Sequence, residues 1–420
     1  MIIVKRGILQ LHNCYFHLDG LPDEIKREDQ PVPFPNSKTV GIFQMPGTTC
    51  LVDRSQFKGG VQEFSKSVGI LNNCGNCIVQ NCQFDSFLGG ALISTMAIET
   101  VLLARDNAFV SCETCGIYVD GPAQPLIIHN VFMACKCSSV ILGSQSDGFV
   151  ALNEMQINNK AVELINNKAI VYGNKIQKCH RDAITILCDS DIHMCCPLIQ
   201  RNYVEASVLC GIVVEGWKSY PVIKANVLDS NRKIGIRLGN KARAHIGGEG
   251  QNTHELTQLM KYVEEVATQN NETKDEFINE DLIKEQLQKY PTIFDDYFGC
   301  QGTQACSSIL DSLEAAILFK EQLLDNILPP YSSASHISTP LGNIIRNNYS
   351  QGILLEETTS AEIFSNLICD NMKAGIALGG ENSGYTRIKY NHIENGKKEG
   401  IFVVEGGEQL VISMNKVVGN

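Results

Sequence analysis

The stretch Asn366-Leu-Ile-Cys-Asp-Asn-Met-Lys-Ala-Gly-Ile-Ala-Leu378 carries the pattern that decides the fold. Its first asparagine is followed nine residues later by a small residue, Gly375, which opens a short apolar segment. In that segment Ile376 and Leu378 lie two residues apart, which is the periodicity of a β-strand and not of a helix. The same offset recurs from Asn81 to Gly90, Asn107 to Gly116, Asn130 to Ser139, Asn174 to Ala183, Asn202 to Gly211, Asn226 to Gly235, Asn343 to Gly352 and Asn391 to Gly400.

The spacing of these units predicts a repeat protein. Gly352, Gly375 and Gly400 are separated by 23 and 25 residues, and the other uninterrupted units are similar. A unit of this length has no room for a crossover helix, so each coil must turn into the next by bends alone. We therefore predict an all-β, single-stranded parallel β-helix of about thirteen coils, counting weaker units that begin at Gly7, Gly41 and Gly69.

Two columns of polar or small residues are expected to line the bends. The first is the asparagine that begins each unit, because its side chain mimics a backbone turn and tolerates left-handed conformations. The second lies five residues later and consists of Ser86, Cys112, Cys135, Cys179, Ser207, Asn231, Asn348 and Asn371. Both columns are interpreted as structural and not as ligand sites.

Composition limits the classes of function. The 420 residues include 17 cysteines, an odd count, and no secretory leader or long apolar run is visible, so a reduced, cytoplasmic protein is expected. The pairs Cys74/Cys77 and Cys112/Cys115 have zinc-like spacing, but their places in the repeat keep them apart, so no metal and no cofactor are expected. The chain has no basic stripe for nucleic acid and no membrane segment.

The repeat disappears between Gly235 and Gly352. Helix-like stretches take its place at Thr253–Gln269, Lys274–Tyr290 and Ala305–Leu328. Residues 252–335 contain fifteen Asp and Glu against five Lys, a net charge of −10 in a chain of net charge −11. This acidic surface is either an ordinary solvated face or a docking surface for a basic protein partner.

The predicted organisation is a first β-helical part at 1–250 with a loop excursion at 18–38, an acidic helical insertion at 251–336, and the last coils at 337–420. The final unit begins at Asn415, and its glycine would fall beyond Asn420. The exposed strand edges of the two ends could therefore make end-to-end or edge contacts.

An enzyme of this architecture would carry its catalytic groups on the outward face of neighbouring strands. Those outward positions are Tyr118, Ile141, Glu163, Thr185, Val213, Arg237, Leu354, Ala377 and Phe402. They contain no cluster of carboxylates of the kind that glycoside hydrolysis needs.

One convergent group of polar residues stands out nonetheless. It consists of Asp189, Asp191 and His193 on one lengthened coil and Glu215, Trp217 and Lys218 on the next. Trp217 is the only tryptophan, and an exposed indole beside carboxylates can hold a sugar ring. The other interpretation is that these are ordinary loop residues.

The units, in particular Asn226-Val-Leu-Asp-Ser-Asn-Arg-Lys-Ile-Gly-Ile-Arg-Leu238, resemble the repeat of the pectate-lyase-like superfamily of right-handed parallel β-helices. They are most similar to its intracellular branch, the β-helix-bearing F-box proteins and the Shc-binding protein family. That resemblance implies a protein-binding or substrate-recruiting solenoid without catalysis. The polysaccharide-active branch would imply a lyase, hydrolase or epimerase, whose sequence signatures are missing here.

The leading prediction is therefore a non-enzymatic, cytoplasmic protein-binding scaffold whose acidic insertion docks a partner. The alternative is a carbohydrate-binding or polysaccharide-active protein centred on Asp189, Asp191, His193, Glu215 and Trp217.

Overall fold

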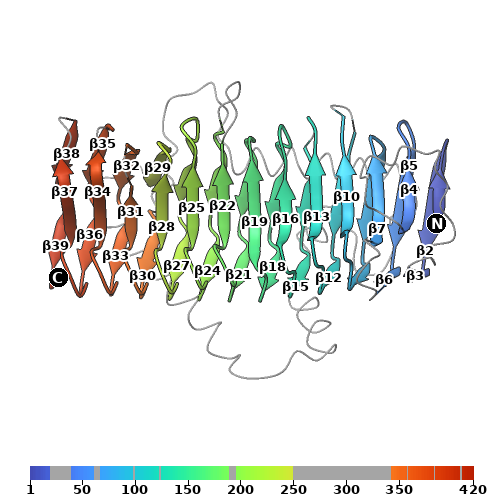
Figure 1. Ribbon diagram of the computed structural model, residues 1–420, viewed down its shortest axis with the longest axis horizontal. Coiled ribbons are helices and arrows are strands. Elements are labelled where there is room, and N and C mark those ends of the chain that lie inside the picture. Colours follow the sequence, from blue (N-terminus) through green and yellow to red (C-terminus); the bar gives the residue numbers. More distant parts are fainter. Residues whose placement is uncertain are drawn as a thin grey trace, which may run out of the picture. The chain divides into compact units, whose positions relative to one another are not determined.

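The computed structural model describes residues 1–18, 39–60, 67–97, 100–122, 124–188, 195–248, 342–356, 358–382, 384–406 and 409–420. These residues form three parallel β-sheets, here called A, B and C, and the chain visits them in that order once per coil (Figure 1). Each sheet has thirteen strands among the described residues, so the prediction of a parallel β-helix of about thirteen coils is confirmed.

Sheet A consists of β1 (Ile2–Val4), β4 (Thr39–Gln44), β7 (Ser67–Asn73), β10 (Gly90–Thr95), β13 (Cys115–Asp120), β16 (Ser138–Leu142), β19 (Lys160–Ile165), β22 (Ile184–Leu187), β25 (Ile212–Glu215), β28 (Ile236–Gly239), β31 (Ile353–Leu355), β34 (Ile376–Asn382) and β37 (Ile401–Gly406). Sheet B consists of β2 (Ile8–His12), β5 (Thr49–Asp53), β8 (Asn76–Gln80), β11 (Leu102–Arg105), β14 (Leu126–Ile128), β17 (Phe149–Ala151), β20 (Ile170–Tyr172), β23 (Leu198–Gln200), β26 (Val222–Lys224), β29 (Arg243–Gly247), β32 (Ser360–Phe364), β35 (Thr386–Lys389) and β38 (Leu410–Ser413). Sheet C consists of β3 (Tyr15–Leu18), β6 (Gln56–Gly59), β9 (Gln83–Asp85), β12 (Ala108–Val110), β15 (Val131–Met133), β18 (Glu154–Gln156), β21 (Lys175–Gln177), β24 (Tyr203–Glu205), β27 (Val227–Asp229), β30 (Ile344–Arg346), β33 (Leu367–Cys369), β36 (His392–Glu394) and β39 (Lys416–Val418).

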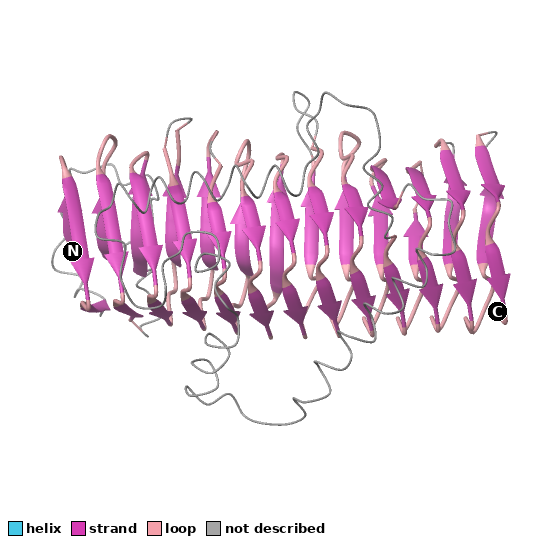
Figure 2. Cartoon of the chain, turned by 180° about the vertical axis from the view of Figure 1, so that it is seen from behind, coloured by secondary structure: helices cyan, strands magenta, loops and turns pink. Residues whose placement is uncertain are grey.

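Strands and loops make up all of the chain that the structure describes (Figure 2). In this part of the chain there is no helix that is long and apolar enough to span a membrane. The chain divides into two compact units, Met1–Glu255 with Thr339–Asn420, and Leu256–Ser338. The second unit, with the predicted acidic helices, lies outside the described residues, as does almost all of the predicted excursion at 18–38. The domain boundaries therefore stay a prediction.

Strand register places equivalent residues of each unit one above another. On sheet A, Ile212 pairs with Ile236 and Ile236 with Ile353, and these side chains are fully buried. Val213 and Arg237 form the next row, on the opposite face, because successive side chains of a strand alternate. The predicted outward row from Tyr118 to Phe402 follows this register from β13 to β37.

Two early units were predicted in the wrong register. Ile8 pairs with Thr49 in sheet B, so Gly7 does not open a strand of sheet A, which begins instead with β1. Gly90 pairs with Val68, one position before the expected row. In this coil the ladder residue is Cys82 and not Asn81, since the Cys82 N–H donates to the Asn107 Oδ1 at 2.9 Å. Counted from Cys82, the nine-residue offset reaches Ala91.

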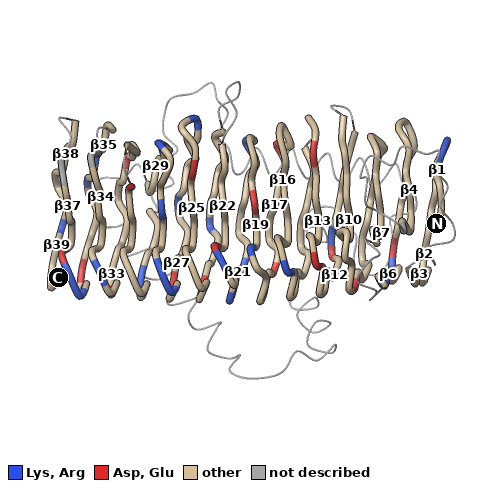
Figure 3. Tube along the Cα trace, viewed as in Figure 1, with Lys and Arg blue, Asp and Glu red and all other residues tan. Residues whose placement is uncertain are grey.

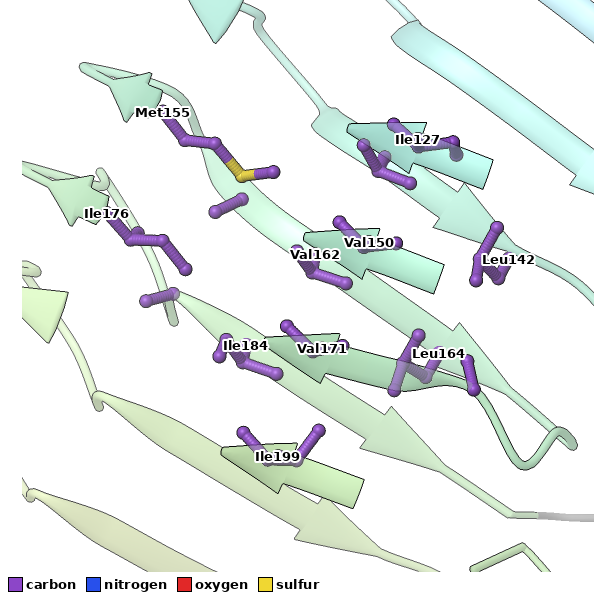
Figure 4. Close-up of a cluster of buried hydrophobic side chains, with 14 of the residues drawn as sticks. Ile127, Leu142, Val150, Met155, Val162, Leu164, Val171, Ile176, Ile184 and Ile199 are labelled. Atoms are coloured by element: carbon purple, nitrogen blue, oxygen red, sulfur yellow. The ribbon is translucent and has the colours of Figure 1, made fainter. Parts of the chain in front are cut away.

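The core is a continuous column of apolar side chains between the three sheets. Figure 4 shows its middle, where Val162 of sheet A, Val171 of sheet B and Ile176 of sheet C belong to one coil. All three are fully buried. Burying one such side chain contributes roughly 1.5–3 kcal/mol. Repetition of this contribution in every coil makes the apolar column the main source of stability.

Aromatic rings occupy the inner row of sheet C in the first five coils. Neighbouring rings in this row are stacked 4.6–5.0 Å apart and are nearly parallel. The row consists of Phe16, Phe57, Phe84, Phe109 and Phe132. From Met155 onward the row continues with aliphatic side chains, so one position accepts either kind of apolar residue.

An asparagine ladder lines the corner between sheets B and C. The Asn202 Nδ2 donates to the Asn226 Oδ1 at 3.0 Å and to the Val171 carbonyl at 2.9 Å. The Asn202 Oδ1 accepts from the N–H and from the Nδ2 of Asn174. The same bonds link Asn107, Asn130, Asn153, Asn174, Asn202, Asn226, Asn343, Asn366, Asn391 and Asn415. The structural interpretation of this column is thus correct.

The predicted backbone conformation of the ladder was wrong. The residue that adopts the left-handed conformation is the one before the ladder asparagine, with φ of 53–62° at every rung except Asn343. These residues are Asp106, His129, Leu152, Gly173, Arg201, Ala225, Ser365, Tyr390 and Met414. Their variety shows that the turn does not select an asparagine for its backbone. The asparagine is needed for its amide, which satisfies backbone groups that the bend leaves without strand partners.

The second column lies at the corner between sheets C and A. The Asn231 Nδ2 donates to the Asn348 Oδ1 at 3.0 Å, and Asn348 donates to Asn371 at 2.9 Å. Earlier coils hold buried Cys112, Cys135 and Cys179 at this place. Ser86 does not belong to the column, because it is half-exposed with a φ of 60° while Phe87 is fully buried.

Candidate functional site

Two of the predicted site residues lie together at the end of one strand. Glu215 is the last residue of β25, and Trp217 lies in the loop that connects β25 to β26. Asp189, Asp191 and His193 fall outside the described residues. The site is therefore built here from the corner between sheets A and B in coils nine to eleven, the coils that contain β25, β28 and β31.

Charged side chains from these three coils meet on the outward face of sheet A. The Arg237 guanidinium donates from Nε to one oxygen of Glu356 at 2.9 Å and from Nη2 to the other at 3.0 Å. Its Nη1 lies 3.2 Å from a carboxylate oxygen of Glu215. The result is a row, Glu215–Arg237–Glu356, in which one cation lies between two carboxylates; we call it the charged row.

Strand register explains this convergence. Glu215 pairs with Gly239, and the register carried one coil further brings Glu356 next to Gly239. A Cβ at Gly239 would lie 2.8 Å from the Glu356 Oε2. The glycine therefore leaves room for the two carboxylates to reach Arg237 from both sides of the middle coil.

The bidentate bond gives the charged row a definite geometry. Hydrogen bonding to Glu356 raises the pKa of Arg237 above its ordinary value, and the charges of Glu356 and Glu215 act in the same direction. The three side chains are 27–40% exposed, so they are accessible from solvent. Figure 3 shows acidic and basic residues together at β25 and the loop above it.

The loop from Gly216 to Pro221, which directly follows Glu215, carries two exposed aromatic side chains. Trp217 is 51% exposed and Tyr220 is 36% exposed. The Lys218 Nζ lies 4.5 Å from the centre of the Trp217 ring, a cation–π contact that occupies one side of the indole. Burial raises the pKa of the Tyr220 hydroxyl, and the charge of Glu362 raises it further.

The loop is held in place by its own backbone and by the preceding coil. The Tyr220 N–H donates to the Cys195 carbonyl at 2.7 Å, and the Cys195 N–H donates to the Lys218 carbonyl at 3.1 Å. Gly216 has a φ of 100°, and a Cβ there would collide with the Cys188 carbonyl oxygen. The aromatic side chains thus project from a fixed backbone.

A disulfide joins Cys188 to Cys195 directly behind this loop. The expectation of a fully reduced chain does not hold for this pair. The interior thiols match the expectation of small buried side chains, and burial raises the pKa of Cys50 and of Cys179 to about 12. Among the residues that the structure describes, no group of three or more His, Cys, Asp or Glu side chains is arranged to hold a metal ion.

Arg237 and Glu356 were not predicted as site residues. The sequence places Glu215 and Glu356 on coils that are not neighbours, which is correct, since β28 separates β25 from β31. The sequence signal that was missed is Arg237, which lies in the outward row on the strand between them. Recognising it required the register across the insertion, because 119 residues separate Arg237 from Glu356 in the sequence.

Comparison with known proteins supports the fold. The family model described as "Right handed beta helix region" matches residues 70–249 and 331–420. No curated protein matches the chain.

Several solved structures resemble the chain at low identity. The periplasmic alginate epimerase AlgG is 14% identical, with a TM-score of 0.42 over 89% of this chain and 62% of that one. The A-modules of two mannuronan C-5 epimerases from Azotobacter vinelandii are also similar. AlgE4 is 10% identical over 91% of this chain and 87% of that one, with a TM-score of 0.36. AlgE6 is 9% identical over 98% of this chain and 91% of that one, with a TM-score of 0.37.

The prediction of a non-catalytic protein-binding scaffold is corrected by these findings. The three solved structures named above are described as alginate or mannuronan C-5 epimerases, which agrees with the alternative prediction instead. The fold rests on the family model, and at TM-scores below 0.5 these structures carry no argument about the site, so the function has to be argued from the geometry of this chain.

Proposed function

We propose, from the premise that the chain belongs to the right-handed beta-helix family, that its solenoid binds carbohydrate at the corner between sheets A and B. The observation that carries the proposal is the half-exposed indole of Trp217 next to the charged row. The finer resemblance of the repeat to intracellular F-box and Shc-binding proteins stays a prediction.

A sugar needs an apolar platform and polar groups at its edge. The faces of a pyranose ring carry C–H groups that pack on an aromatic ring, and Trp217 offers such a ring with Lys218 on one side only. Sugar hydroxyl groups need acceptors and donors, and carboxylate oxygens have room for several hydrogen bonds each. Glu215 ends β25 two residues before Trp217, and we propose that its carboxylate oxygens serve these hydroxyl groups.

The backbone geometry suits a rigid binding surface. The loop that carries Trp217 is bonded to Cys195 of the preceding coil, and Glu215 and Arg237 lie on β-strands. Little conformational freedom then has to be lost on binding, which favours affinity.

We propose binding, and not turnover, as the function of these residues. A general base must carry an unprotonated group within reach of the proton that it removes. The two carboxylates of the charged row are both in contact with the Arg237 guanidinium between them, and do not face each other across an open space as a catalytic acid and base do. Their arrangement is that of a fixed recognition surface.

The experiment is a glycan array followed by calorimetry with purified chain and a Trp217→Ala variant. We expect at least one oligosaccharide to bind, and affinity to fall about tenfold or more in the variant, since a central tryptophan commonly contributes that much. Tyr349→Ala is the matched control, because Tyr349 is 63% exposed but lies at the corner between sheets C and A. An equal loss in both variants, or binding that Trp217→Ala leaves unchanged, would contradict the proposal.

A further inference from the structure

We infer that the glycan taken by this site is a neutral oligosaccharide and not a polymer of uronic acids. The inference rests on the proposed function and adds the class of ligand to it. It follows from how the charges around Trp217 are already paired.

A carboxylate of the protein already engages the donors of Arg237 on its bidentate side. Recognition of a uronate carboxylate needs a cation whose donors are available, and a guanidinium does this best through two parallel N–H bonds. In the charged row all three nitrogens of Arg237 face carboxylate oxygens, with two on Glu356 and one on Glu215. Two of the five N–H donors remain, but a ligand carboxylate could take the bidentate side formed by Nε and Nη2 only by replacing Glu356.

The formal charges of the side chains at this corner nearly cancel. The charged row has two carboxylates and one guanidinium, a formal net charge of −1. Lys218, over the indole ring, and the exposed Lys241 of the connection between β28 and β29 bring the sum to +1. Glu362 and Arg243, whose charges both act on Tyr220, cancel each other. Among the described residues of this corner the charges therefore nearly balance, so a polyanion is attracted only weakly.

The charged row offers hydrogen-bond acceptors to the hydroxyl groups of a sugar. The Glu356 side chain is 40% exposed, and its carboxylate oxygens have lone pairs beyond those used by Arg237. Hydroxyl groups of a neutral sugar can donate to these oxygens. A uronate carboxylate cannot donate and would be repelled, because like charges in contact are unfavourable.

The experiment compares two classes of oligosaccharide on the intact chain by calorimetry at low and at physiological salt. The neutral probes are hexamers of glucose, mannose and xylose, and the acidic probes are oligomers of mannuronate and galacturonate. We expect wild type to bind a neutral probe more tightly than any acidic one. The affinity for the neutral probe should change little with salt, because no ligand charge is involved.

Charge variants make the test sharper. The double variant Glu215→Gln/Glu356→Gln releases the guanidinium, so we expect binding of acidic probes to rise by about tenfold or more, the strength of a charge-assisted hydrogen bond. Adding Arg237→Met to that variant should remove the gain. The single variant Glu356→Gln gives the same test with less change to the surface, and thermal unfolding verifies that each variant is folded.

The outcomes separate this inference from the proposed function. If wild type binds an acidic probe more tightly than the neutral ones, and Trp217→Ala loses that binding, the ligand is not neutral. The proposed carbohydrate site would then still stand. Acidic binding that does not rise in the charge variants would also overturn the inference of a neutral ligand. Wild type that binds none of the probes or arrayed glycans would contradict the carbohydrate site itself.

Discussion

Two corners of the same coils differ in almost every respect. At the corner between sheets B and C, strands are joined by two residues, such as Ala225 and Asn226 between β26 and β27, in every coil except the one that carries the insertion. At the corner between sheets A and B, the connection ranges from Cys74–Gly75 to the ten residues 188–197. The first corner repeats one hydrogen-bonded arrangement, and the second varies from coil to coil. The difference indicates that the solenoid keeps its stabilising interactions at one corner and exposes its recognition groups at the other.

The insertion shows how strongly the first corner is specified. It enters at this corner, between Gly247 at the end of β29 and Ile344 at the start of β30. The ladder nonetheless continues, since the Asn226 Nδ2 donates to the Asn343 Oδ1 at 3.0 Å across 117 residues of sequence. The hydrogen bonds of the ladder, and not the length of the connection, therefore define this corner.

Breaking one rung should have the largest effect on stability. Asn202→Ala removes the amide that serves the Asn174 backbone N–H and the Val171 carbonyl, both inside the ladder. Each buried group left without a partner costs about 1–3 kcal/mol, so we expect the free energy of unfolding to fall by about 3 kcal/mol. Chemical denaturation with a β-sheet signal measures this change.

Asn159→Ala is the control for that variant, because Asn159 is half-exposed at the corner between sheets C and A. Its expected effect is within about 0.5 kcal/mol. Equal destabilisation by the two variants would mean that the ladder has no special role.

Much of the fold follows from the sequence, because the repeated unit is local. Asn366 and Gly375 lie within one unit, and the alternation of Ile376 and Leu378 is visible without knowledge of other coils. Where the unit is atypical, prediction slips by one residue, as at Cys82, whose thiol stands in place of an amide. The residue type before a rung carries no signature either, since Leu152 and Arg201 both adopt the left-handed conformation.

The site is harder to predict because it depends on contacts between coils. Trp217 could be identified as a candidate from its type alone, and its exposure agrees with that interpretation. The bond between Arg237 and Glu356 could not, because it spans the insertion and depends on the register of three strands. A glycine, Gly239, makes this bond possible, and no pattern in the sequence distinguishes it from the many other glycines.

The tight corners contain strain that a smaller side chain can relieve. Ala206 adopts a φ of 56° at the corner between sheets C and A. An L-residue in this conformation costs roughly 1–2 kcal/mol, whereas glycine adopts it freely and loses roughly 0.5–1 kcal/mol of backbone entropy. We therefore expect Ala206→Gly to raise the free energy of unfolding by about 0.5 kcal/mol. Ala108→Gly, within β12, should lower it instead, and thermal unfolding of both variants shows whether the signs are opposite.

The smallest expected effect on stability belongs to the variant with the largest expected effect on binding. Trp217 is 51% exposed in a loop whose backbone bonds do not involve its side chain. Trp217→Ala should therefore change the free energy of unfolding by less than about 0.5 kcal/mol, the usual range for surface positions.

Under conditions where it is folded, Asn202→Ala should bind the glycan like wild type while being far less stable, because β23 and β24 place it at the other corner. This opposite pair of phenotypes, measured by denaturation and by calorimetry on the same samples, would demonstrate that stabilising and recognition groups are separated in each coil. A loss of more than about 1 kcal/mol in Trp217→Ala would instead assign the indole to the structural frame, since such a value exceeds what an exposed side chain normally contributes.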